Sequence, residues 1–143
     1  MYIVISVVLI LYLLGLSILD IRSQKVPTLL IWSFIGLLVL EVAINNQGRV
    51  TLSILGGAVG LLMLIISKLT KEALGYGDGL LVLGLGISLG LWKILWLLMI
   101  AFFGAAIFAI GLLVLKRAKR KSTLPFIPFI CASYIILFVF EIM

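Results

Sequence analysis

Two aspartates, Asp20 and Asp78, stand beside long apolar stretches of this chain. A carboxylate at membrane depth costs about 3 kcal/mol on insertion scales, so such residues are candidates for a functional site. The second aspartate lies in the segment Gly75-Tyr76-Gly77-Asp78-Gly79. Its glycines leave room for a substrate backbone next to the carboxyl group, and we expect them to release this segment from helix geometry.

Two nearby carboxyl groups in a poorly hydrated site do not both ionise readily, so one keeps a proton while the other is charged. The charged group can take a proton from water while the neutral group donates to the oxygen of a scissile carbonyl. This is the chemistry of aspartic proteolysis. The sequence has no histidine and one cysteine, Cys131, so it offers neither a zinc site nor a Ser/His or Cys/His nucleophile. We expect no cofactor, and the pattern does not decide which aspartate is the acid.

The composition is that of a membrane protein. Hydrophobic residues make up 65% of the 143 residues and charged residues 11%, whereas about a quarter of the residues in soluble domains are charged. Mean hydropathy is +1.44. The apolar run beginning at Tyr2 follows no basic region and is therefore interpreted as a permanent first span. We predict an all-α fold with six transmembrane helices, in a single domain over residues 1–143.

The six expected spans follow the apolar stretches. They are residues 2–19, 28–44, 51–67, 79–91, 94–115 and 124–143. Asp20 ends the first span, and Gly56, Gly57 and Gly60 in the third allow close helix packing. The turn between the fourth and fifth spans is expected over residues 90–93, with Trp92 and Lys93 at the membrane interface.

The fourth span is short, about 20 Å as a helix. If Trp92 and Lys93 hold its outer end at the interface, Asp78 is recessed below the inner membrane surface, in a pocket lined by Gly75 and Gly77. Local thinning of the bilayer is the competing explanation.

The basic residues predict the orientation in the membrane. The loops after the first, third and fifth expected spans carry nine of them, namely Arg22, Lys25, Lys68, Lys71, Lys116, Arg117, Lys119, Arg120 and Lys121, against two, Arg49 and Lys93, in the other loops. The richer set faces the cytosol. Both termini are then outside, and Asp20 and Asp78 share the cytosolic side. Topology also accounts for the net charge of +6, so we expect a lipid bilayer and no nucleic acid as partner.

Three segments resemble motifs of the type IV prepilin peptidases, a family of GxGD membrane aspartyl proteases. Asp20-Ile21-Arg22-Ser23-Gln24-Lys25-Val26-Pro27 is similar to the first motif, and Leu74-Gly75-Tyr76-Gly77-Asp78 to the Gly-x-Gly-Asp motif. Leu124-Pro125-Phe126-Ile127-Pro128-Phe129 resembles the Pro-Phe-Gly-Pro-Phe segment that opens the last span. The motifs occur in the family's order, and the resemblance extends over nearly the whole chain.

The chain also departs from the family pattern. Thr28 follows the first proline where Asn is usual, Gly79-Leu80 replaces a frequent Val-Lys pair, and Ile127 replaces the usual Gly. The missing lysine would otherwise be a cation near Asp78. The paired CxxC motifs of the methyltransferase domain in long members are absent from this sequence, so the resemblance implies cleavage without N-methylation.

The resemblance implies Asp20 and Asp78 as the catalytic pair and a prepilin, pseudopilin or archaellin-like precursor as the substrate. Such a precursor has a basic leader in the cytosol and an apolar helix in the membrane. Gly75 and Gly77 would shape the substrate-binding site, and Glu72 is a candidate for binding the basic leader. Against this, Asp20 could be an interface residue, Asp78 a helix cap, and Glu72 a solvated acid beside Lys71.

Two other classes of function remain open from the sequence. A small proton-coupled transporter or channel would also use two intramembrane acids, although it would favour acids near the midplane and internal symmetry. A non-catalytic membrane scaffold would use the glycines for packing only.

Overall fold

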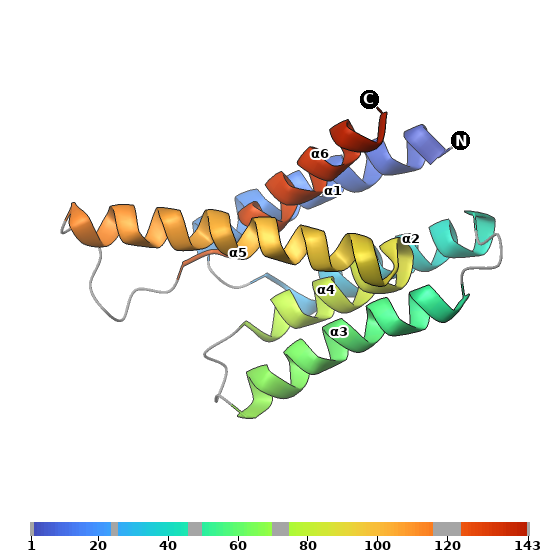
Figure 1. Cartoon of the computed structure of the whole chain (residues 1–143), viewed down its shortest axis with the longest axis horizontal. Helices are drawn as coiled ribbons and strands as arrows, with labels where there is room; N and C mark the ends of the chain where they lie inside the picture. The colour runs from blue at the N-terminus through green and yellow to red at the C-terminus, as the bar shows by residue number, and fades with distance from the viewer. Residues whose placement is uncertain (1, 24–25, 46–49, 70–74, 116–123, 143) are drawn as a thin grey trace.

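The computed structural model describes residues 2–23, 26–45, 50–69, 75–115 and 124–142, and this part of the chain is all-helical (Figure 1). It contains α1 (Tyr2–Ser23), α2 (Thr28–Asn45), α3 (Val50–Leu69), α4 (Tyr76–Leu89), α5 (Leu91–Val114) and α6 (Ile127–Ile142). The expected all-α fold is confirmed, and the helices fall on the six expected apolar stretches.

Successive helices run in opposite directions, so the two ends of the bundle carry different helix termini (Figure 1). One end carries the last turns of α1 and α3 and the first turns of α2, α4 and α6. It is called the site end here because it contains Asp20 of α1 and Asp78 of α4. The far end carries both chain termini, which lie near each other in Figure 1. Gly90, between α4 and α5, also lies at the far end.

Three of these helices, α1 from Ile3 onward, α3 and α5, are long and apolar enough to cross a membrane. The other three, α2, α4 and α6, are apolar but shorter. Large apolar side chains are widely exposed on the long helices, for example Val4 (66%), Ile54 (65%) and Phe103 (70%). The length, composition and exposed apolar surface of the helices indicate a membrane protein.

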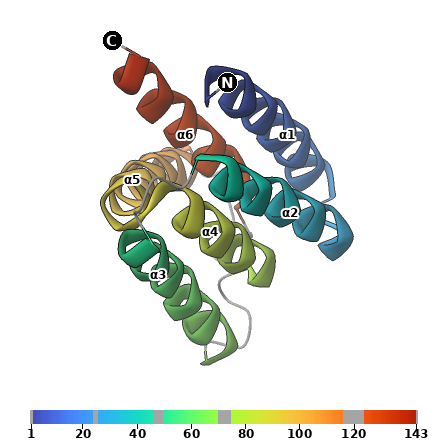
Figure 2. The ribbon, with the colours of Figure 1, turned by 90° about the vertical axis from the view of Figure 1, so that its right-hand side faces the viewer.

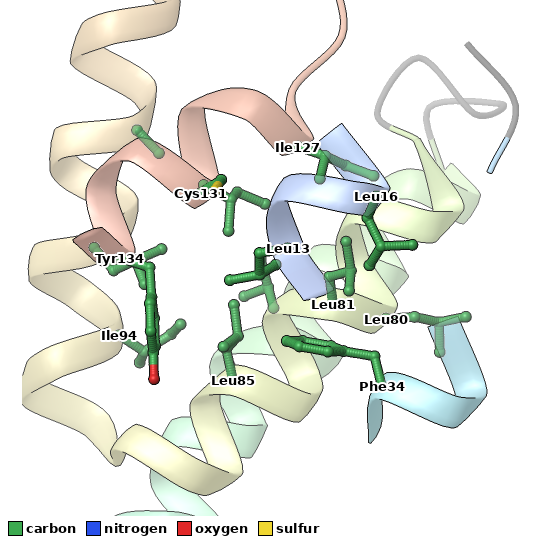
Figure 3. Close-up of a cluster of buried hydrophobic side chains, with 14 of the residues drawn as sticks. Leu13, Leu16, Phe34, Leu80, Leu81, Leu85, Ile94, Ile127, Cys131 and Tyr134 are labelled. Carbon is green, nitrogen blue, oxygen red and sulfur yellow. The ribbon is translucent and has the colours of Figure 1, made fainter. Parts of the chain in front are cut away.

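Helix α4 occupies the middle of the bundle, with α2, α3 and α5 around it (Figure 2). Its buried residues are Gly79, Leu80, Leu81, Val82, Gly84, Leu85 and Gly86. Figure 3 shows side chains from α1, α4 and α6 meeting in one apolar cluster, among them Leu13, Leu81 and Cys131. Asp78 in the first turn of α4 is therefore carried by the most enclosed helix of the bundle.

The α3 and α4 backbones touch at glycines. A Cβ atom built on Gly56 would lie 2.1 Å from the carbonyl oxygen of Gly86, and one on Gly60 would lie 2.1 Å from Cα of Leu83. Both separations are far below a van der Waals contact, so only glycine permits this approach. The expectation that Gly56, Gly57 and Gly60 allow close packing agrees with this geometry.

The turn between α4 and α5 is tighter than expected. Gly90, with φ of +79°, is the one residue between the two helices. Trp92 and Lys93, assigned to the turn from the sequence, lie in the first turn of α5 instead. The positive φ that glycine accepts without strain reverses the chain in a single residue, so a longer loop is not needed.

Gly56→Ala is expected to destabilise the protein by about 1–3 kcal/mol, because the added methyl group forces α3 away from α4. Gly36→Ala in α2 is the matched control, since a Cβ atom there meets nothing within 4 Å. Thermal unfolding of the purified protein in detergent measures both. Equal stability of the two variants would contradict the tight α3–α4 contact.

Candidate active site

Asp20 lies inside α1, not at its end, because the helix continues to Ser23. The expected end of the first span at Leu19 is therefore too early. The Asp20 side chain is buried, with 8% of its surface exposed. Its Oδ2 atom accepts a hydrogen bond of 3.2 Å from the backbone N–H of Ile127, the first residue of α6. This partner, 107 residues further along the chain, explains how a carboxyl group is accommodated among apolar helices.

Asp78 lies in the first turn of α4. The helix begins at Tyr76, with Gly75 as its N-cap residue (φ −57°, ψ 126°). The N–H groups of Asp78 and Gly79 donate to the Gly75 carbonyl oxygen over 3.1 and 3.3 Å. The expectation that the glycines release this segment from helix geometry is therefore wrong: Gly77, Asp78 and Gly79 are helical.

The glycines around Asp78 serve close packing instead. A Cβ atom on Gly79 would lie 2.8 Å from Cδ2 of Leu64 in α3, and one on Gly77 would lie 2.9 Å from Cδ1 of Ile31 in α2. Tertiary packing of α4 between α2 and α3 thus overrides the low helix propensity of glycine. It holds Asp78 at the site end of the bundle.

The fold places Asp20 and Asp78 at the same end of the bundle, within electrostatic range of each other. Direct packing of α1 on α4 is not the main cause, because α1 packs chiefly against α6. The central position of α4 places the first turns of α4 and α6 near the last turns of α1. Two carboxyl groups that interact in this way do not both ionise readily, which is what a division of acid and base duties requires.

Of the residues expected to shape the site, Gly75 lies against Asp78. A Cβ atom on Gly75 would lie 2.8 Å from Oδ2 of Asp78, so a larger residue would push this carboxyl group aside. Gly77 is helical and its open side faces Ile31. Glu72, the candidate for leader binding, lies outside the described residues, as does the neighbouring Lys71.

Two polar contacts escaped the sequence analysis. One is the Ile127 N–H on Asp20; the third motif directed attention to this segment, but a backbone donor has no signature in the residue types. The other involves Glu41, which is buried at the far end, where the Ser88 hydroxyl donates to its Oε2 over 2.5 Å. Among the described residues, no group of three His, Cys, Asp or Glu side chains could hold a metal ion.

Fold and site together define a helical membrane protein with a pair of interacting carboxyl groups at one end of its bundle. A family model described as the type IV leader peptidase family matches residues 7–110, which include both aspartates. The chain therefore belongs to this family of peptidases, and the resemblance stated from the sequence is confirmed. Neither the curated proteins nor the solved structures contain a match to the chain.

Gly75→Ala is expected to lower the rate of leader-peptide cleavage by about 10–100-fold, because misplacing a catalytic group by about 1 Å has an effect of this size. The backbone of Gly75 (φ −57°, ψ 126°) is open to alanine, so folding should be unaffected. Cleavage by purified protein measures the loss, with thermal unfolding as the control. An active Gly75→Ala variant would show that the carboxyl group tolerates displacement.

Proposed function

We propose that this protein is a membrane aspartic endopeptidase that removes the basic leader of prepilin-like precursors at the cytosolic face of the cell membrane, without N-methylation. Its membership of the type IV leader peptidase family supports leader peptidase activity in general. The observation that carries the aspartic mechanism is the placement of two carboxyl groups, Asp20 and Asp78, within electrostatic range of each other among apolar helices. The substrate is a prepilin, pseudopilin or archaellin-like precursor.

In this mechanism the aspartate pair holds one proton and a water molecule. The ionised carboxylate takes a proton from the water as its oxygen attacks the carbonyl carbon, and the neutral carboxyl protonates the carbonyl oxygen. The tetrahedral diol then collapses: the first carboxyl protonates the departing amine, and the second recovers its proton. Gly75 leaves space beside Asp78 for the peptide, and Glu72 binds the basic leader.

All six helices span the membrane in one domain, with the site end in the cytosol and both termini outside. The described cations support this orientation: Arg22 and Lys68 lie in the last turns of α1 and α3 at the site end, and Lys93 lies in the first turn of α5 at the far end. Helix α4 is short, and with Trp92 and Lys93 at the outer interface in the first turn of α5 it leaves Asp78 recessed below the cytosolic surface. The bilayer is the partner of the exposed apolar surface, and nucleic acid has no role.

Asp20→Asn and Asp78→Asn are each expected to lower cleavage of a co-expressed prepilin by roughly 10²–10⁴-fold, the range for general acid–base groups. Glu41→Gln is the matched control, because it neutralises a buried carboxyl at the far end while keeping an oxygen that can accept from Ser88. Immunoblots of membrane fractions measure processing and insertion together. Cleavage by either Asn variant would exclude the pair, and a proton flux abolished by these variants would favour a transporter.

The orientation is tested with single cysteines placed at Ser23 in the last turn of α1 and at Thr51 in the first turn of α3. Both residues are polar and exposed at opposite ends of the bundle. In a Cys131→Ala background, a membrane-impermeant thiol reagent added to intact cells should label Thr51→Cys and spare Ser23→Cys. Labelling only after permeabilisation would be expected for Ser23→Cys. The reverse pattern would place the aspartates outside the cytosol.

A further inference from the structure

The two aspartates differ in their hydrogen-bonding environment. Asp20 accepts the Ile127 N–H over 3.2 Å, and the backbone of Phe126 also interacts with its carboxyl group. For Asp78, the described residues provide burial and the charge of Asp20, with no hydrogen-bond donor among them. Donors to a carboxylate favour its charged form.

The Ile127 N–H is available to Asp20 because of its place in α6. It belongs to the first residue of the helix, whose N–H groups have no acceptor within the helix. Hydrogen bonds and ring contacts fix the start of α6. The Phe126 carbonyl oxygen accepts from the backbone N–H groups of Phe129 and Ile130 over 3.0 and 3.2 Å. The rings of Phe126 and Phe129 lie 5.0 and 5.7 Å from Phe102 and Phe108 of α5. The donor is therefore held in position before any substrate binds.

We propose that the backbone N–H of Ile127 is a positioning group that keeps Asp20 as the ionised member of the pair, so that Asp20 takes the proton from water and Asp78 protonates the carbonyl oxygen. This assignment rests on the proposed peptidase function and deepens it. The dipoles of α1 and α4 act in the opposite direction, since Asp20 is near a helix C-terminus and Asp78 near an N-terminus. The direct charge-assisted hydrogen bond from Ile127 to Asp20 outweighs the effect of the helix dipoles, because the partial charge of a dipole is distributed over several backbone groups at the helix end.

Few other charges act on Asp20 among the described residues. On α4, the group that interacts electrostatically with Asp20 is the Asp78 carboxyl group. On α6, the Cys131 thiol is hydrogen-bonded with Ser17 of α1. Arg22 on α1 is exposed, as is Tyr76 on α4. On α2, the described carboxyl group is Glu41, at the far end of the bundle. A change at Ile127 should therefore act on the pair through Asp20.

Ile127→Pro removes the N–H at a helix position where proline is well tolerated, because its fixed φ suits the first residue of a helix. Ile127→Val is the matched control, since valine has as many side-chain carbons as proline and keeps the N–H. Cleavage of a synthetic peptide with a basic leader and an apolar segment is measured against pH for both variants in detergent. In the bell-shaped profile of kcat/KM, the acidic limb reports protonation of the base and the alkaline limb deprotonation of the acid.

Loss of the donor is expected to move the acidic limb of Ile127→Pro to higher pH by about one unit relative to Ile127→Val, with the alkaline limb in place. An unchanged profile, or a shift of the alkaline limb instead, would overturn the assignment. Should Ile127→Pro fail to fold, replacing Ile127 by its α-hydroxy acid removes the N–H and keeps the isoleucine side chain, and the same shift is required. The proposed function fails separately, if the wild-type protein cleaves no leader peptide.

Discussion

The close contact between the α3 and α4 backbones at Gly56, Gly60 and Gly86 organises the bundle. It lets a 14-residue helix lie in the middle of the bundle, where α2 and α5 pack against its other sides. In lipid, where apolar side chains gain little by leaving their solvent, such close backbone approach is a main source of helix association. The position of Asp78 follows from it, because this residue lies in the first turn of α4.

The start of α6 completes the site from the opposite side. The first N–H of this helix meets Asp20. Phe129 in its first turn and Phe126 just before it pack on α5. The three motifs noted in the sequence therefore have three different physical roles. One supplies a buried carboxyl group, one supplies a second carboxyl group on a glycine-packed helix, and one supplies a backbone donor. The backbone donor matters because a buried carboxylate without a hydrogen-bond partner would be costly.

Several features could be predicted from the sequence, and several could not. The all-α fold and the helix positions followed from hydropathy, and the selection of Asp20 and Asp78 as candidate residues followed from the rarity of acids in apolar helices. The helical state of Gly77 to Gly79 was missed, because local propensity argues against it and only packing on Leu64 and Ile31 favours it. The single-residue turn at Gly90 and the burial of Glu41 were missed for a similar reason, since both depend on neighbours far along the chain.

Residue order alone identifies the class of protein, because apolar run lengths, basic loops and acids beside apolar runs are local properties. The surroundings of each carboxyl group depend on the fold. Asp20 and Asp78 are equivalent as residue types, and nothing in their neighbours in sequence distinguishes an acid from a base. The structural difference between them is the N–H group that α6 places against Asp20. Backbone donors are the same in every residue, so their effect depends on where the fold puts them.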